Sequence, residues 1–213
     1  LMAKARTYLD WNATAPLHPV AREAMLRAFD LTGNPSSVHA EGRAARTALE
    51  TARRQVAALF AAEANHVTFT SGATEAANLV LTPEFLMGRS PLAVGHLYVS
   101  AIEHPAVREG GRFPKEKVSE IPMIPDGVIG LDALAAALAA HDSASGLPMV
   151  AVMLANNETG IVQPIAEVAR IVHARGGVLV VDAVQAAGRI PVGLAALDID
   201  FLRRLPQSLL LCD

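Results

Sequence analysis

The feature that most constrains the fold is an alternation of short apolar runs with Ala-rich segments of helical periodicity. The runs predict strands at 66–70, 96–100, 117–123, 149–154 and 177–182. The Ala-rich segments predict helices at 18–30, 41–60, 73–81, 131–140 and 164–175. Near-continuous apolar strands separated by helices are typical of a sheet covered on both faces. We therefore predict an α/β fold with a mostly parallel sheet flanked by helices.

Composition narrows the class of protein. Of the 213 residues 52% are hydrophobic and the net charge is only −3, which excludes a disordered chain and predicts at least one sizeable core. No run of Lys and Arg forms a basic stripe, so we expect no nucleic-acid partner. Segments 83–95 and 141–148, rich in Pro, Gly and Ser, are predicted surface loops.

Cysteine content and apolar run length indicate the compartment. The single cysteine, Cys212, excludes a disulfide framework and a Cys-rich metal site, so we expect a cytoplasmic protein with no metal. The N-terminal residues contain no apolar export signal, and no apolar stretch approaches the ~18 residues of a membrane span. We therefore expect no membrane partner.

Ligands of such sheets bind at the carboxyl ends of the strands, so polar residues that follow each apolar run are the candidate site. The first group is TSGATE at 70–75, between a predicted strand and a helix. Successive backbone N–H groups at a helix N-terminus, with the hydroxyls of Ser71 and Thr74, suit a phosphate. The alternative is an ordinary Gly turn that caps a helix.

Two more groups follow strands. His104, in the sequence IEHP after the strand at 96–100, can stack on a flat ring or transfer protons, or it can simply cap the next helix. The sequence NNETG at 156–160 places two amides and a carboxylate at a strand end, which a plain turn also explains in part.

Asp182 ends the apolar strand predicted at 177–182. A carboxylate there is costly to bury unless it meets a cation or hydrogen-bond donors, so Asp182 is the best candidate partner for a protonated ring nitrogen. Gln185 follows one turn later. The alternative is that Asp182 caps a following helix.

Taken together, the motifs resemble one family. They are YLDWNATAP (8–16), GNPSSVH (33–39), EGR (41–43), FTSGATE (69–75), EH (103–104), NNETG (156–160) and VDAVQ (181–185). Their order and spacing are similar to those of the cysteine desulfurases, pyridoxal-phosphate enzymes of the class V aminotransferase group and of fold type I. The resemblance runs from about residue 7 to 202.

The resemblance implies a role for each candidate residue. Ala73 and Thr74 would hold the phosphate of pyridoxal 5'-phosphate, and His104 would stack on its ring and assist proton transfers. Asp182 would keep the pyridine nitrogen protonated, which makes the ring an electron sink.

Two further residues and the reaction follow from the same resemblance. Asn157 and Gln185 would bond the phenolic oxygen of the ring, with the loop at 34–39 nearby. The family converts L-cysteine to L-alanine and leaves a persulfide on an enzyme cysteine, from which sulfur passes to iron–sulfur clusters or thio-cofactors. Homodimers and a sulfur-acceptor or scaffold protein are the implied partners. A selenocysteine lyase or another class V enzyme is the alternative activity.

The sequence departs from the family near its end. Ala15 stands where a second Thr is common, and no Ser-x-His-Lys segment, the source of the Schiff-base lysine, follows Leu202. Ser208 falls near that lysine's position, and Cys212 is not the expected persulfide cysteine. Only three lysines occur in the chain, none beyond Lys117.

We therefore expect an N-terminal segment at 1–30, a partial cofactor-binding large domain at 31–202 and a divergent tail at 203–213, without the small C-terminal domain. A change of reading frame after codon 202 would explain the tail. The resemblance implies that this chain alone is inactive. The alternatives are a non-catalytic module that binds pyridoxal phosphate or a partner, and a fragment that folds poorly.

Overall fold

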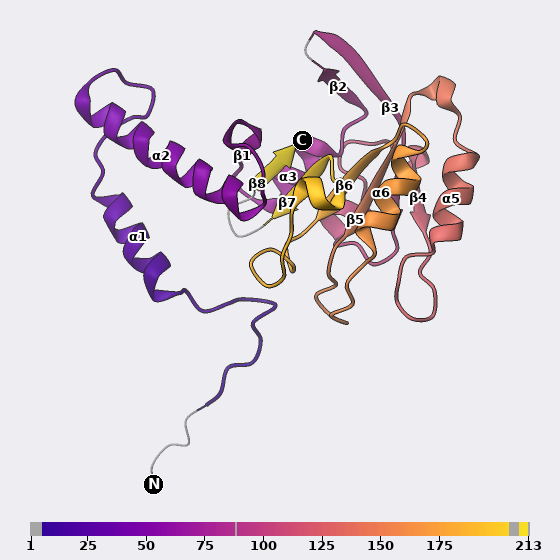
Figure 1. Cartoon of the computed structure of the whole chain (residues 1–213), viewed down its shortest axis with the longest axis horizontal. Helices are drawn as coiled ribbons and strands as arrows, with labels where there is room; N and C mark the ends of the chain where they lie inside the picture. Colours follow the sequence, from indigo (N-terminus) through magenta and orange to yellow (C-terminus); the bar gives the residue numbers. More distant parts are fainter. Residues whose placement is uncertain (1–5, 88, 205–208, 213) are drawn as a thin grey trace. The chain divides into compact units, whose positions relative to one another are not determined.

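The computed structural model describes residues 6–87, 89–204 and 209–212 (Figure 1). Ser208 and Lys4 lie outside the described residues. Contacts divide the chain into two compact units, residues 1–53 and 54–213. The domain boundaries at 30 and 202 stay predictions.

The first unit contains α1 (Pro19–Phe29) and most of α2 (Ala40–Leu59). Pro19 opens α1, where its missing N–H removes no helical hydrogen bond, and His18 caps the helix by accepting from the backbone N–H of Val20 at 3.3 Å. Both helices were predicted from periodicity.

The second unit holds the sheet and its flanking helices. Its helices are α3 (Ala73–Val80), α4 (Pro105–Arg108), α5 (Leu131–Ala139), α6 (Ile165–His173) and α7 (Leu194–Leu197). Its strands are β1 (Val67–Phe69), β2 (Glu84–Met87), β3 (Ser90–Ser100), β4 (Val118–Ile121), β5 (Leu147–Met153), β6 (Val178–Asp182), β7 (Phe201–Arg204) and β8 (Leu209–Cys212). No helix in the described part of the chain is long and apolar enough to cross a membrane.

The described strands form one mixed sheet in the order β1-β8-β7-β6-β5-β3-β2, and β4 also pairs with β3. Strands β3, β4, β5, β6 and β7 run parallel, whereas β1, β8 and β2 are antiparallel to their neighbours. The predicted α/β fold with a mostly parallel sheet is confirmed.

The predicted loop at 83–95 is wrong, because β2 and the first half of β3 form an antiparallel hairpin there. Pro91 lies in the outer part of β3, paired with Leu86, and Pro is tolerated at such a sheet edge. The Pro and Gly content that suggested a loop instead marks the edge of the sheet. Likewise the predicted loop at 141–148 contains a short 3-10 helix and the start of β5.

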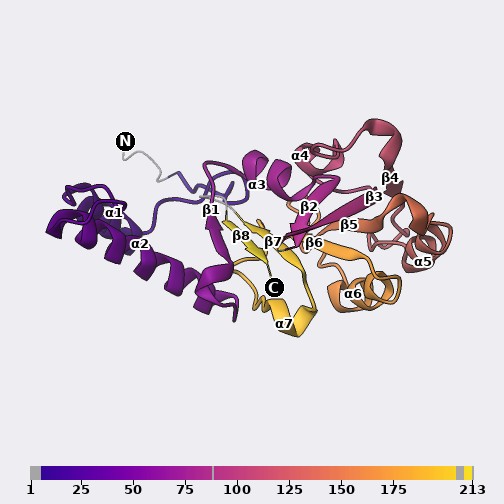
Figure 2. The same ribbon diagram turned by 90° about the horizontal axis from the view of Figure 1, so that it is seen from above.

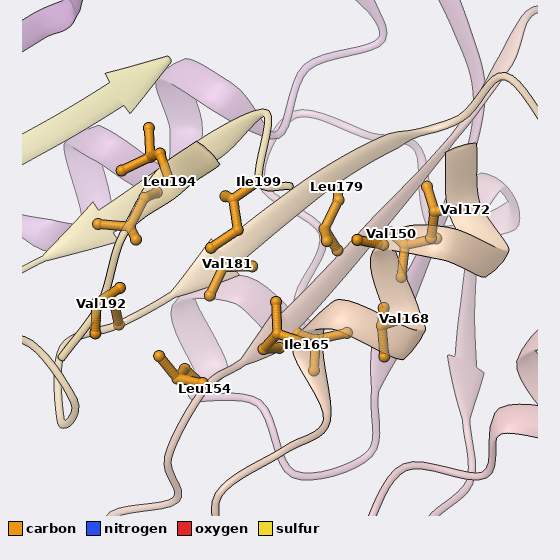
Figure 3. Close-up of a cluster of buried hydrophobic side chains, with 14 of the residues drawn as sticks. Val150, Leu154, Ile165, Val168, Val172, Leu179, Val181, Val192, Leu194 and Ile199 are labelled. Atoms are coloured by element: carbon orange, nitrogen blue, oxygen red, sulfur yellow. The ribbon is translucent and has the colours of Figure 1, made fainter. Parts of the chain in front are cut away.

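Helices cover both faces of the sheet, α3 and α4 on one and α5, α6 and α7 on the other (Figure 2). Alternate residues of the central strands divide between two cores. Val150 and Val181 pack with α6 and α7 (Figure 3), whereas Met149 and Ala151 pack with α3 and α4. Burial on both faces explains why these strands are apolar throughout.

A histidine with two carboxylates ties α6 to the start of β7. His173 Nδ1 lies 2.8 Å from Asp198 Oδ2, and Nε2 lies 2.9 Å from Asp200 Oδ2. Asp200 also accepts from the backbone N–H of Leu179 at 2.7 Å. Burial lowers the pKa of His173, but the bonds to Asp200 and Asp198 outweigh it and raise the pKa overall. These contacts fix β7 beside β6.

Candidate active site at the carboxyl edge of the sheet

The candidate site lies where the parallel strands end. Asp182 is the last residue of β6 and is in register with Met153 of β5 and Arg203 of β7. The backbone of Leu154 donates to the Asp182 carbonyl at 2.9 Å, and that of Ala183 donates to the Arg203 carbonyl at 2.9 Å. The sheet's own hydrogen bonds therefore set the position of the Asp182 carboxylate.

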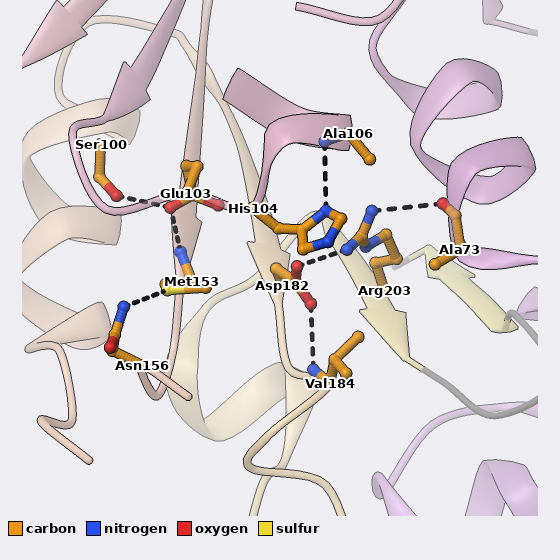
Figure 4. A network of polar contacts seen from close by, with 10 residues as sticks. All are labelled: Ala73, Ser100, Glu103, His104, Ala106, Met153, Asn156, Asp182, Val184 and Arg203. Atoms are coloured by element: carbon orange, nitrogen blue, oxygen red, sulfur yellow. Dashed lines mark hydrogen bonds and ion pairs between the residues drawn. The ribbon is translucent and has the colours of Figure 1, made fainter. Parts of the chain in front are cut away.

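Asp182 forms a buried ion pair with Arg203. Arg203 Nη2 donates to Asp182 Oδ2 at 2.6 Å, and the two side chains are only 4% and 6% exposed (Figure 4). The second carboxylate oxygen accepts from the backbone N–H of Val184 at 3.0 Å. In this structure the buried carboxylate of Asp182 is thus paired with a cationic side chain of the same chain, and its pairing with a ring nitrogen stays a prediction. No helix begins at Asp182, so the capping alternative does not apply.

The same guanidinium reaches the start of α3. Arg203 Nη1 donates to the carbonyl oxygen of Ala73 at 3.2 Å. Ala73 and Asp182, the residues that the resemblance gives to the phosphate and the ring nitrogen, therefore lie on one side of the sheet with the guanidinium between them (Figure 4).

The turn before α3 is closed by Glu75. Gly72 is the N-cap of α3, and the Glu75 carboxylate accepts from the backbone N–H of Ser71 at 2.5 Å and from its hydroxyl at 2.7 Å. These two bonds lower the pKa of Glu75, so it is an anion at neutral pH. Donors that suit a phosphate are thus already used by an exposed carboxylate, while Thr74 is exposed beside it.

Glu103 is a second buried acid at this edge. Its Oε1 accepts from Ser100 Oγ and from the backbone N–H of Met153, both at 2.5 Å. Burial raises the pKa of Glu103 to about 8; the Ser100 bond opposes this rise and the charge of Asp182 adds to it. Glu103 is therefore mostly protonated and uncharged at neutral pH.

A small cavity separates these groups from α3. It measures about 10 Å³ and is lined by Glu103, Asp182 and Arg203 together with apolar residues of α3, α4 and the central strands. Space of this size holds about one water molecule. Among the described residues, Glu103 Oε2 and Arg203 Nε are buried without a hydrogen-bond partner. Larger hollows of about 660 and 610 Å³, beside β2 and β4, include none of the predicted site residues.

The remaining predicted residues lie in the turns of the same edge. His104 is exposed and caps α4, with Nδ1 accepting from the backbone N–H of Ala106 at 3.2 Å. Asn157 is exposed in the turn after β5, and Gln185 is half-buried in the turn after β6. Asn156, not Asn157, holds its turn, because its Oδ1 accepts from the backbone of Glu158 and Thr159 at 2.9 Å each.

Sequence reasoning gave no role to Arg203 or Glu103. The pattern that pointed to Asp182, a charged residue at the end of an apolar run, also applies to Arg203, which directly follows Phe201-Leu202. Glu103 was visible only as part of a motif. Its burial depends on Met153, which is remote in the sequence.

None of the described residues places a lysine at this edge of the sheet. Lys115 and Lys117, the two lysines that the structure describes, lie in a 3-10 turn before β4, at the amino end of the parallel strands. The carboxylates of the site lie at the opposite end.

The chain matches the family Aminotransferase class-V over residues 7–204. A cysteine desulfurase of Cereibacter sphaeroides is 39% identical over 211 residues, which cover 92% of this chain and 50% of that protein. An IscS-like cysteine desulfurase of Mycobacterium tuberculosis is 37% identical over 196 residues, covering 89% of this chain and 49% of that protein.

Solved structures of related proteins have a similar fold. A NifS-like protein from Rickettsia africae superimposes with a TM-score of 0.83 at 30% identity, covering 96% of this chain and 57% of that one. Another NifS-like protein gives a TM-score of 0.81, also at 30% identity, and covers 98% of this chain and 59% of that one. The chain spans about half the length of the curated relatives it matches.

Proposed function

Since this chain belongs to the class V aminotransferase family, we propose that it provides the cofactor-facing sheet edge of a cysteine desulfurase. The proposed reaction converts L-cysteine to L-alanine and transfers the sulfur to an enzyme cysteine as a persulfide. The relatives at 37% to 39% identity support this activity over others of the family. We further propose that the protein pairs with a second copy of itself, passes its sulfur to an acceptor protein and acts in the cytoplasm.

The proposed cofactor is pyridoxal phosphate, with the residue roles that the sequence motifs suggest. Ala73 and Thr74 would face its phosphate, and Asp182 its ring nitrogen. His104 would stack on the ring, and Asn157 and Gln185 would bond the phenolic oxygen. The observation that carries this proposal is the shared contact of Ala73 and Asp182 with one guanidinium, which supports a single site between them.

The residues as arranged do not fit the cofactor. Asp182 is already paired with Arg203, and the cavity beside it is about 10 Å³, far less than a substituted pyridine ring needs. We therefore derive no chemical step through the cofactor. What the chain's own residues do is hold an anionic carboxylate, Asp182, and an uncharged acid, Glu103, side by side at the edge of the sheet.

Replacing Thr74 with alanine tests the phosphate end. The probe is pyridoxamine phosphate, whose amine cannot condense with lysines as an aldehyde would. Loss of one hydroxyl donor to a charged phosphate is expected to weaken its binding on the order of tenfold, measured by isothermal titration calorimetry. Thr82→Ala, near the other end of α3, is the matched control. Equal affinity of the Thr74→Ala variant and the unaltered chain would contradict the proposed phosphate site.

The second prediction concerns turnover. We expect the 213-residue chain, given pyridoxal phosphate and L-cysteine, to release no sulfide above an Asp182→Ala control, because no described lysine lies at the edge and Asp182 is paired with Arg203. We also expect no visible absorbance of a lysine-bound cofactor. Sulfide release that depends on Asp182 would show that the chain is active as it stands.

A further inference from the structure

We propose that Arg203 and the ring nitrogen of the cofactor compete for Asp182, so that the guanidinium must leave this carboxylate before the ring can bind. The inference rests on the proposed function, because it concerns the same site. In this proposal the Arg203 guanidinium provides Asp182 with the positive charge that the ring nitrogen of the cofactor would otherwise provide.

The position of the guanidinium carries the first step. Its two terminal nitrogens bond the Ala73 carbonyl at 3.2 Å and Asp182 Oδ2 at 2.6 Å. These contacts join the two ends of the proposed site, so a ring between Ala73 and Asp182 would occupy the space that the guanidinium fills. The remaining cavity, about 10 Å³, leaves no room for both.

Charge gives the second step. A carboxylate that is 6% exposed is costly to bury without a cation or hydrogen-bond donors, and Arg203, 4% exposed, provides the cation. A protonated ring nitrogen would bring a second positive charge to the same carboxylate and would repel the guanidinium in a site with little water to screen them. Binding of the two cations is therefore mutually exclusive on both steric and electrostatic grounds.

The pair is also imperfect. Arg203 Nε is buried without a hydrogen-bond partner among the described residues, so the guanidinium is not fully satisfied in this position. At the phosphate end, by contrast, the Glu75 carboxylate that bonds Ser71 is exposed and can turn into solvent at little cost. Arg203 rather than Glu75 is thus the main barrier to binding.

The test compares affinities for pyridoxamine phosphate by isothermal titration calorimetry. Arg203→Gln removes the charge while keeping a long polar side chain that can still donate to Asp182. We expect it to bind the probe on the order of tenfold more tightly than the unaltered chain. Arg203→Gln combined with Asp182→Asn should lose this gain. Arg108→Gln, which removes an arginine from an exposed ion pair with Glu120, should leave affinity unchanged.

A second measurement uses the unaltered chain. Arg203 should resist an arginine-specific dicarbonyl reagent in the free chain and should react when pyridoxamine phosphate saturates the site, as read by mass spectrometry. Protection of Arg203 in that complex would overturn the competition, whether or not the variants fold. An Arg203→Gln variant that folds and binds the probe no more tightly than the unaltered chain would also overturn the competition. If Thr74→Ala nevertheless weakens binding of the probe, the proposed cofactor site itself is still supported. Absence of binding in every folded chain would overturn both proposals.

Discussion

Replacing Arg203 with methionine is expected to lower the free energy of unfolding of this chain by about 3–5 kcal/mol. The change leaves Asp182, 6% exposed, as a buried charge with no cation at its Oδ2 atom. The stem of the side chain is kept, so lost packing contributes little. Urea denaturation followed by circular dichroism measures the effect.

Two control variants isolate the charge. Arg203→Met with Asp182→Asn removes both charges and should recover most of the lost stability, because a buried ion pair is of little net value once both partners are replaced. Arg108→Met removes one partner of an exposed pair with Glu120 and should change stability by at most about 1 kcal/mol. A single variant at 203 no more harmful than Arg108→Met would show that the pair is not as buried as described.

Replacing Glu103 with glutamine is expected to raise the free energy of unfolding relative to the unaltered chain, by an amount that grows as the pH rises. With a pKa of about 8 in the folded chain against 4.5 unfolded, the carboxyl is protonated when folded and ionised when unfolded across this interval. Its contribution is fully present below pH 4.5 and is lost as pH rises toward 8. The advantage of glutamine should therefore grow by about 3–4 kcal/mol between pH 5 and pH 8.

The difference in unfolding free energy between the two chains is compared at pH 5 and pH 8. Because both chains share every other titrating group, the contributions of those groups cancel in this difference. Gln keeps an oxygen for Ser100 and Met153, so the two chains should be of similar stability at pH 5. Glu116→Gln, at an exposed carboxylate, serves as the matched control. An advantage that is the same at both pH values would mean that Glu103 ionises normally.

The central fold could be predicted because its strands are buried on both faces. The runs at 149–154 and 177–182 became β5 and β6 almost residue for residue, since a buried parallel strand must be apolar throughout. The β2–β3 hairpin could not be predicted this way. Its residues are partly exposed and include Pro91, so local composition resembled a loop while pairing between the strands decided the outcome.

The need of Asp182 for a charged or hydrogen-bonding partner could be predicted from the sequence, whereas the identity of that partner could not. Burial of Asp182 called for a cation or hydrogen-bond donors, and in this structure Arg203 provides the cation. Which side chain meets Asp182 depends on the pairing of β6 with β7, which no local pattern encodes. The raised pKa of Glu103 similarly depends on burial that only the folded chain produces and on the nearby Asp182, while the hydrogen bond from the Met153 backbone opposes the rise.

The register of β6 and β7 has a consequence for how the chain reaches its fold. Asp182 lies opposite Arg203, and Val181 opposite Leu202. A slip of one residue in the direction that places Leu202 beside the carboxylate would turn the guanidinium toward the apolar core under α6 and α7. Both charges would then be buried alone. The ion pair thus adds to the hydrophobic pattern in disfavouring this misalignment of the strands during folding.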